Sequence, residues 1–464
     1  MKLSFPASTA CHWCLPVLFV GLLFFASAAL HGWPVGNSWH DQQRIFQLAL
    51  LVLVTPLALL GARQALAPRA LQALVAILIL GAVSSHLSAF PAWAFKEWAR
   101  YGGLLLLAVL LGSIARHDGL QRAIVWLLLA VGIIHAWQFL VYYLMAFVTG
   151  IYMLSPLLLF EGFDNPRFFG QFQMLLLPML AVWSMQLHDD DRKRLAGLLF
   201  LVLVVQWCIA FLLAGRGLWV GLLTGHLALL SICPQLWRVV AVQAAGGGLG
   251  FVLLQVLFSL IPSLVGLDSI IGADNLRTSL SGRDQLWGWA WDMAVANPWL
   301  GAGPMHYAAS HNPIAAHPHQ VVLQWLAEWG FPATLLALAL GVWGVLHGAG
   351  VMRRQDVEPQ DAGLWLVIVG ALVLAQVDGV FVMPYTETWL AVLMGLAQAR
   401  WSRPAPAGRA QLLFVGALVL PVALVLGGVL LLEVPKLIEV QEAYLQEHAT
   451  GWKPRFWLQG WIPM

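Results

Sequence analysis

The chain has 464 residues, of which 60% are hydrophobic and only 10% are charged, and its formal net charge is +2. So few polar residues cannot cover a soluble globular protein, and the small charge, without a basic cluster interleaved with aromatic residues, argues against nucleic-acid binding. The apolar runs are continuous rather than alternating, which favours spanning helices over spanning strands. The sequence therefore indicates an all-α, polytopic integral membrane protein.

Apolar runs recur from end to end, and about 12 to 13 are long enough to cross a hydrocarbon core, which takes about 20 helical residues. The first follows Lys2 and contains the small-residue step FASAAL, which resembles a secretory signal, although an uncleaved helix serves equally well. The expected spans are approximately 15–30, 45–61, 70–88, 101–115, 122–148, 167–187, 194–214, 217–232, 238–262, 319–348, 362–380, 385–400 and 410–433.

Arginine and lysine residues predict the orientation of these spans. If the N-terminus is cytoplasmic, every short cytoplasmic connection contains at least one arginine, as the positive-inside rule requires. The cations on the opposite, translocated face have no orientation role and need another explanation. They are Arg44, Lys96, Arg100, Arg167, Arg216, Arg277 and Arg283.

The longest connection, residues 263–318, also lies on the translocated face. It divides the chain into an N-terminal bundle (1–262), this loop, C-terminal helices (319–433) and a tail (434–464). Within the loop, an amphipathic helix from about Asp284 to Ala296, stopped by Asn297-Pro298, is expected along the membrane surface. Loops of this length in a compact protein are usually functional.

Three arginines on this face could bind an anion. Arg216 stands between two glycines in a short hairpin that a bulky anion can approach closely, although it could also be an arginine that snorkels to the interface. Arg283 begins the loop helix, whose N-terminus attracts phosphate, or it pairs with Asp284 or Asp292.

Arg167 begins the sixth span and shares a helix face with Gln171, one turn later. It could contribute to the same anion site, or it could pair with Glu161 or Asp164 and anchor the helix at the interface.

The segment NPIAAHPHQVVLQWLAEWG, from Asn312 to Gly330, carries a candidate general base. Pro318 predicts that a helix begins at Pro318 or His319, after which Gln320, Gln324 and Glu328 form one polar stripe. An imidazole accepts a proton near neutral pH, so His319 is the candidate base, although it could instead cap the helix. His317 is expected to shape the turn, and Glu328 has no evident role.

Four histidines, His306, His311, His317 and His319, raise the alternative of a metal site. Their irregular spacing and the absence of cysteine differ from zinc sites, so no metal and no other cofactor is expected.

Taken together, the GR turn at Arg216, the R-x-x-x-W element at Arg283, NPWLGAGP and HPHQVVLQWLAEWGFPA resemble the O-antigen ligase and polymerase superfamily from about Asn165 to Arg400. The resemblance implies the C-type glycosyltransferase architecture, with a site facing the periplasm of a bacterial inner membrane. It places the family's essential hairpin arginine on Arg216, its loop arginine on Arg283 and its histidine on His319. The usual His-Asn pair is His-Gln here, at His319-Gln320.

The resemblance also implies the substrates. Arg216 and Arg283, helped by Arg167, would hold the diphosphate of an undecaprenyl-linked glycan, and His319 would deprotonate the acceptor hydroxyl, so that transfer proceeds with inversion. His317, Gln320 and Gln171 would support them. An O-antigen ligase with lipid A-core as acceptor is favoured over an O-antigen polymerase and over a protein O-oligosaccharyltransferase, which usually has a large C-terminal domain. A transporter or flippase is the alternative from another class.

Overall fold

The computed structural model describes residues 9–35, 38–116, 118–267, 282–448 and 451–463. In these ranges the chain is helical, and the only strand-like feature is an isolated bridge between Gln64 and Pro406. The main helices are α1 (Thr9–Ser27), α2 (Trp39–Gly61), α3 (Pro68–Leu87), α4 (Pro91–Ile114), α5 (Asp118–Val148), α6 (Pro166–Asp189), α7 (Lys193–Leu212), α8 (Arg216–Ile232), α9 (Trp237–Gln255), α10 (Ile261–Leu264), α11 (Arg283–Ala296), α12 (Val321–Met352), α13 (Pro359–Leu374), α14 (Pro384–Trp401), α15 (Arg409–Gly428) and α16 (Leu437–His448).

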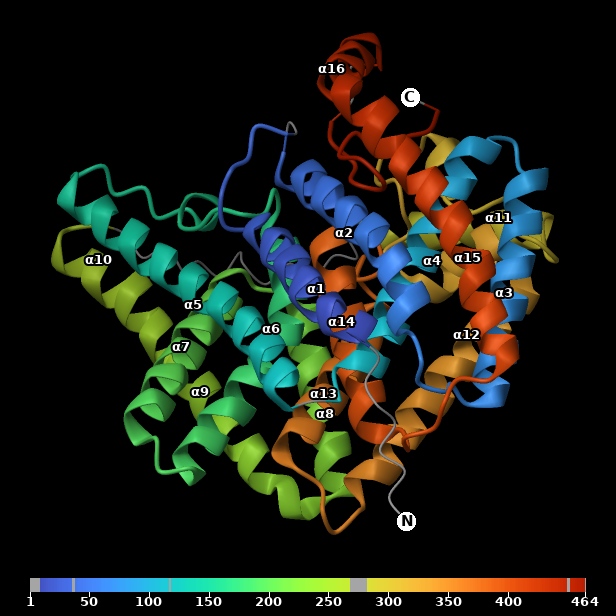
Figure 1. The fold of residues 1–464 in the computed structure, drawn as a ribbon. Coiled ribbons are helices and arrows are strands. Elements are labelled where there is room, and N and C mark those ends of the chain that lie inside the picture. Colours follow the sequence, from blue (N-terminus) through green and yellow to red (C-terminus); the bar gives the residue numbers. More distant parts are fainter. Residues whose placement is uncertain (1–8, 36–37, 117, 268–281, 449–450, 464) are drawn as a thin grey trace.

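The expected all-helical membrane architecture is confirmed. Nine helical segments of the described chain are long and apolar enough to cross a membrane, and three shorter apolar helices accompany them, α1, α8 and α13. Each of the expected spans coincides with one helix or helical run. Consecutive spanning helices alternate in direction. Helices α2, α4, α6, α8, α12 and α14 therefore all begin at one end of the bundle, here called the site end. Figure 1 shows α16 at this end.

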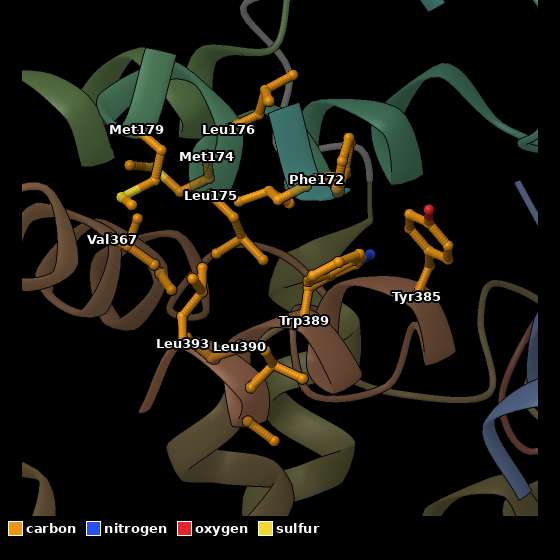
Figure 2. Packing of buried hydrophobic residues seen from close by; sticks show 14 of the residues in the cluster. Phe172, Met174, Leu175, Leu176, Met179, Val367, Tyr385, Trp389, Leu390 and Leu393 are labelled. Atoms are coloured by element: carbon orange, nitrogen blue, oxygen red, sulfur yellow. The ribbon is translucent and has the colours of Figure 1, made fainter. Parts of the chain in front are cut away.

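Helix α6 forms the centre of the bundle. Its residues from Phe169 to Met185 are all buried, as expected for a mostly apolar helix with neighbours on every side. Figure 2 shows Phe172, Leu175 and Met179 of α6 packed against α13 and against Trp389 of α14. This packing fixes the position of α6 along the bundle, and so places its N-terminus, with Arg167, at the site end.

Small residues bring α8 and α13 together. Gly217, Gly221 and Gly225 repeat at four-residue spacing along one face of α8, and a Cβ atom on Gly221 would lie 2.9 Å from the carbonyl oxygen of Gly370 in α13. Such spacing lets two membrane helices approach closely. The contact sets Arg216, the first residue of α8, against the loop that follows α13.

Helix α12 is 32 residues long and contains one break, at Gly330 (φ 78°, ψ 171°). The turn after α11 packs at this break: Phe331 N–H donates to the Pro298 carbonyl at 2.8 Å, and Ala302 N–H donates to the Ala327 carbonyl at 2.8 Å. Leu286, Ala290 and Ala294 of α11 are buried on its inner face. Helix α11 therefore lies on the first part of α12. Its bounds, Arg283–Ala296, agree within one residue with the predicted helix from about Asp284 to Ala296.

Candidate functional site

Three arginines come together at the site end from three different helices. Arg167 is the second residue of α6, Arg216 is the first of α8 and Arg283 is the first of α11. Partial burial lowers the pKa of Arg283, Asp378 opposes this effect, and the nearby positive charges of Arg167 and Arg216 reinforce it. Three like charges repel one another, so the cluster favours a multiply charged anion between them.

Arg167 could have paired with Glu161 or Asp164, and Arg283 with Asp284 or Asp292. None of these ion pairs forms within the described ranges. Arg167 is exposed, and Asp164 instead caps α2, because its carboxylate accepts the backbone N–H groups of Trp39 and His40 at 3.1 and 2.6 Å. The Nε atom of Arg283 is buried without a hydrogen-bond partner. Neither α8 nor α11 has a side-chain cap. The Arg216 N–H donates to the Ala214 carbonyl at 2.9 Å, and the helix N–H groups that follow it face the direction from which an anion can bind.

His319 has an unusual backbone and a carboxylate neighbour. Its φ of 54° is left-handed, which costs a non-glycine residue about 1–3 kcal/mol and is characteristic of functional sites. Its side chain is 20% exposed, and its Nδ1 lies 3.7 Å from Oδ1 of Asp378. The prediction that the helix begins at Pro318 or His319 is wrong: α12 begins at Val321, because the Gln320 side chain caps it by accepting the Leu323 N–H at 2.5 Å.

Asp378 is a candidate site residue that the sequence analysis missed. Gln171 Nε2 donates to its Oδ1 at 2.9 Å, and the Gly379 N–H donates to the same atom at 2.8 Å. Burial raises the pKa of Asp378, but His319, the Gly379 N–H and Arg167 together hold it below its ordinary value. The carboxylate is therefore ionised at neutral pH beside the imidazole. The available signal was an acidic residue at the translocated end of an apolar run, without a cation close in sequence.

The predicted supporting residues lie around this pair. His317 is buried, its Nδ1 accepts the His319 N–H at 3.3 Å, and the two rings are 4.0 Å apart. Burial lowers the pKa of His317 well below its ordinary value, and the neighbouring His319, Arg455 and His40 side chains lower it further, so the ring is neutral. Gln320 donates to Oε1 of Gln376 at 3.0 Å.

The other two histidines of the loop have separate structural contacts. His306 Nε2 accepts the Phe90 N–H at 3.0 Å, and His311 Nε2 lies 2.8 Å from the Ile462 carbonyl oxygen. In the part of the chain that the structure describes, no three His, Cys, Asp or Glu side chains are grouped as metal ligands. The histidines that come together are His317 and His319.

The site thus combines a cationic cluster with an imidazole–carboxylate pair, which can hold a dianionic leaving group and accept a proton beside it. Residues 199–338 match the model of a protein family described as O-antigen ligase. This match confirms the resemblance found in the sequence, and it includes Arg216, Arg283 and His319. A comparison with curated proteins finds no significant match.

Proposed function

We propose that this chain, whose residues 199–338 match an O-antigen ligase family, transfers a glycan from undecaprenyl diphosphate to a sugar hydroxyl of lipid A-core. The reaction takes place on the periplasmic face of a bacterial inner membrane. The observation that carries the proposal is the meeting of three arginines without ion-pair partners in the described chain and the His319–Asp378 pair at one end of a membrane bundle.

Each group has a distinct role in the proposed reaction. Arg216 and Arg283, with Arg167, hold the diphosphate and neutralise the charge that develops as its bond to the anomeric carbon breaks. His319 accepts the proton of the acceptor hydroxyl as that oxygen forms the new bond to the anomeric carbon. Asp378 stabilises the resulting imidazolium. A single displacement of this kind inverts the anomeric configuration.

Reconstitution of the purified protein tests this function. An undecaprenyl diphosphate-linked glycan is supplied with three acceptors in turn: lipid A-core, a second lipid-linked glycan and an acceptor protein. We expect transfer to lipid A-core without an ion gradient. Product formed only with the second glycan would indicate a polymerase, product formed only with the protein would indicate an oligosaccharyltransferase, and gradient-dependent movement without transfer would indicate a transporter.

Alanine variants test the residues. Arg216→Ala, Arg283→Ala and His319→Ala should each lower kcat by about 100-fold or more, because each removes charge stabilisation or the base. Arg192→Ala is the matched control, since Arg192 is exposed at the other end of the bundle and should be dispensable. Undiminished transfer by His319→Ala at normal protein levels would rule out the proposed base.

A further inference from the structure

The segment after the last helix folds back into the protein. Residues 451–463, here called the C-terminal strap, are irregular, yet Arg455, Phe456, Trp457, Leu458 and Ile462 are at most 4% exposed. Irregular segments usually lie on the surface, where water satisfies their backbone groups. The buried strap must therefore find its partners within the protein. The strap follows α16, at the site end (Figure 1).

One side of the strap is bonded to the first turns of α2. The Arg44 side chain donates through Nε to the Phe456 carbonyl at 3.0 Å, and a second nitrogen donates to the Arg455 carbonyl at 3.2 Å. Oδ1 of Asp41 accepts the Leu458 N–H at 2.8 Å. Two buried side chains of α2 thus hold the middle of the strap.

The other side of the strap contacts the segment that leads to His319. The Ile462 N–H donates to the Ala308 carbonyl at 3.5 Å, and the rings of His311 and Trp461 stack 4.8 Å apart. Gly460 has a left-handed backbone, and a Cβ atom on it would lie 3.0 Å from Cβ of Ala316. The strap therefore lies against residues 308–316, directly before His317.

Arg455 links the strap to α12 and α4. It donates to Glu328 of α12 at 2.7 Å and to Glu97 of α4 at 3.0 Å, and all three side chains are at most 3% exposed. The other carboxylate oxygen of Glu328 accepts the Tyr307 N–H at 3.1 Å. Glu328 thus connects the strap to the beginning of the same segment.

We propose that the C-terminal strap positions the candidate base and that Arg455 is a positioning residue that acts through Glu328 and residues 306–317 on His319. His319 has a left-handed backbone, and His317 beside it is confined by Gly379, where an added Cβ would lie 2.6 Å from Cε1. A conformation of this kind persists only where its surroundings hold it. This inference rests on the proposed function, in which His319 is the base.

Chemical labelling combined with kinetics tests the strap in the full-length protein. Diethyl pyrocarbonate modifies accessible imidazoles, and mass spectrometry reads each histidine separately. In Arg455→Met we expect modification of His317 to become about tenfold faster or more and kcat to fall at least about tenfold, because misplacement by about 1 Å costs this much or more. The donor KM should stay within about threefold, because the arginines on α6 and α8 are retained. Arg455→Lys should recover part of the rate, since an ammonium keeps the positive charge between the two carboxylates but lacks the planar set of donors of the guanidinium.

Three internal controls make the result specific. His135 and His226 are buried in distant helices and should remain protected, which excludes global unfolding. Trp452→Ala changes a strap residue that is 48% exposed and should leave both kcat and the labelling unchanged. If His135 and His226 also react in Arg455→Met, the test is made with Ile462→Ala, which shortens a buried side chain without leaving a carboxylate unpaired.

The outcomes separate the two proposals. An unchanged kcat in Arg455→Met would overturn the positioning role, whether His317 becomes reactive or stays protected. The proposed function would remain intact. Absence of transfer by the wild-type protein would overturn the proposed function, and full transfer by His319→Ala would overturn the role of His319 as the base. In both cases the labelling would still report whether the strap covers His317.

Discussion

Three buried polar atoms at the candidate site have no hydrogen-bond partner in the described part of the chain: Nε of Arg283, Nδ1 of His319 and Oε1 of Gln171. A buried polar atom without a partner costs about 1–3 kcal/mol. Arg283 Nε and Gln171 Oε1 lie where an anionic substrate and a sugar hydroxyl would meet in the proposed reaction, and substrate groups would satisfy them. Nδ1 of His319 faces Asp378 at 3.7 Å, and a small approach of the two side chains would pair them as the imidazolium forms.

The role of Asp378 is tested by Asp378→Asn, which keeps the shape of the side chain and removes its charge. We expect kcat to fall by about 100-fold, because the imidazolium formed at His319 loses its counter-charge. The donor KM should not rise, since a negative charge near the diphosphate is removed. Steady-state transfer measures both constants. Asp284→Asn, an exposed acid in the first turn of α11, is the control, and wild-type kcat in Asp378→Asn would refute the role.

His317 should make the protein sensitive to acid. Its pKa is lowered by burial and by His319, Arg455 and His40, so the unfolded chain binds a proton at a higher pH than the folded protein does. The stabilisation is complete above about pH 6.5 and is lost as the pH falls below it, by up to about 1.4 kcal/mol per pH unit. Thermal unfolding at pH 7.5 and 5.0 should show a smaller acid-induced loss in His317→Gln than in the wild type. His86→Gln, at an exposed position, should behave like the wild type, and an equal loss in His317→Gln would contradict the assignment.

At the scale of the elements, the apolar runs predicted the helices well because hydrophobicity and length alone decide membrane spans. The start of α12 was wrong by a few residues, because a proline signal cannot show that Gln320 would cap the helix and leave His319 left-handed. The break at Gly330 was also missed. A glycine in an apolar run is compatible with a continuous helix, and only the approach of the turn after α11 requires the break.

Gly330→Ala tests that break. The alanine would need a backbone conformation that is essentially reserved for glycine, and its Cβ would lie 2.5 Å from the Trp299 carbonyl oxygen. We expect a loss of about 1–3 kcal/mol or more in the free energy of unfolding, measured by denaturant in detergent. Gly344→Ala in the same helix has no atom within 4 Å of the new Cβ and should be neutral or slightly stabilising. Equal stability of the two variants would show that the break is not needed.

At the scale of the whole molecule, a buried chain of charges joins distant parts of the sequence. Three arginines alternate with three glutamates in the order Arg44, Glu387, Arg100, Glu97, Arg455, Glu328. This chain of charges explains why Arg44 and Arg100, two of the cations predicted on the translocated face, are present there. It also supplies Arg455 as the partner of Glu328. Pairing of this kind could not be predicted, because nothing in a single sequence relates residues so far apart. Most of the chain of charges lies outside residues 199–338, so the matched domain depends on a scaffold built by the rest of the protein.

Glu387 joins two arginines of that scaffold, because its two oxygens pair with Arg44 at 2.7 Å and with Arg100. Glu387→Gln removes the charge that both guanidinium groups share, and it should lower the free energy of unfolding by about 3–5 kcal/mol, since an uncompensated buried charge remains. Asp189→Asn breaks the exposed pair with Arg238 and should cost at most about 1 kcal/mol. Denaturant unfolding of both variants in detergent measures the difference. Similar small losses in both would mean that water reaches the chain of charges, and the strap would then be held by its backbone bonds to α2 rather than by Arg455.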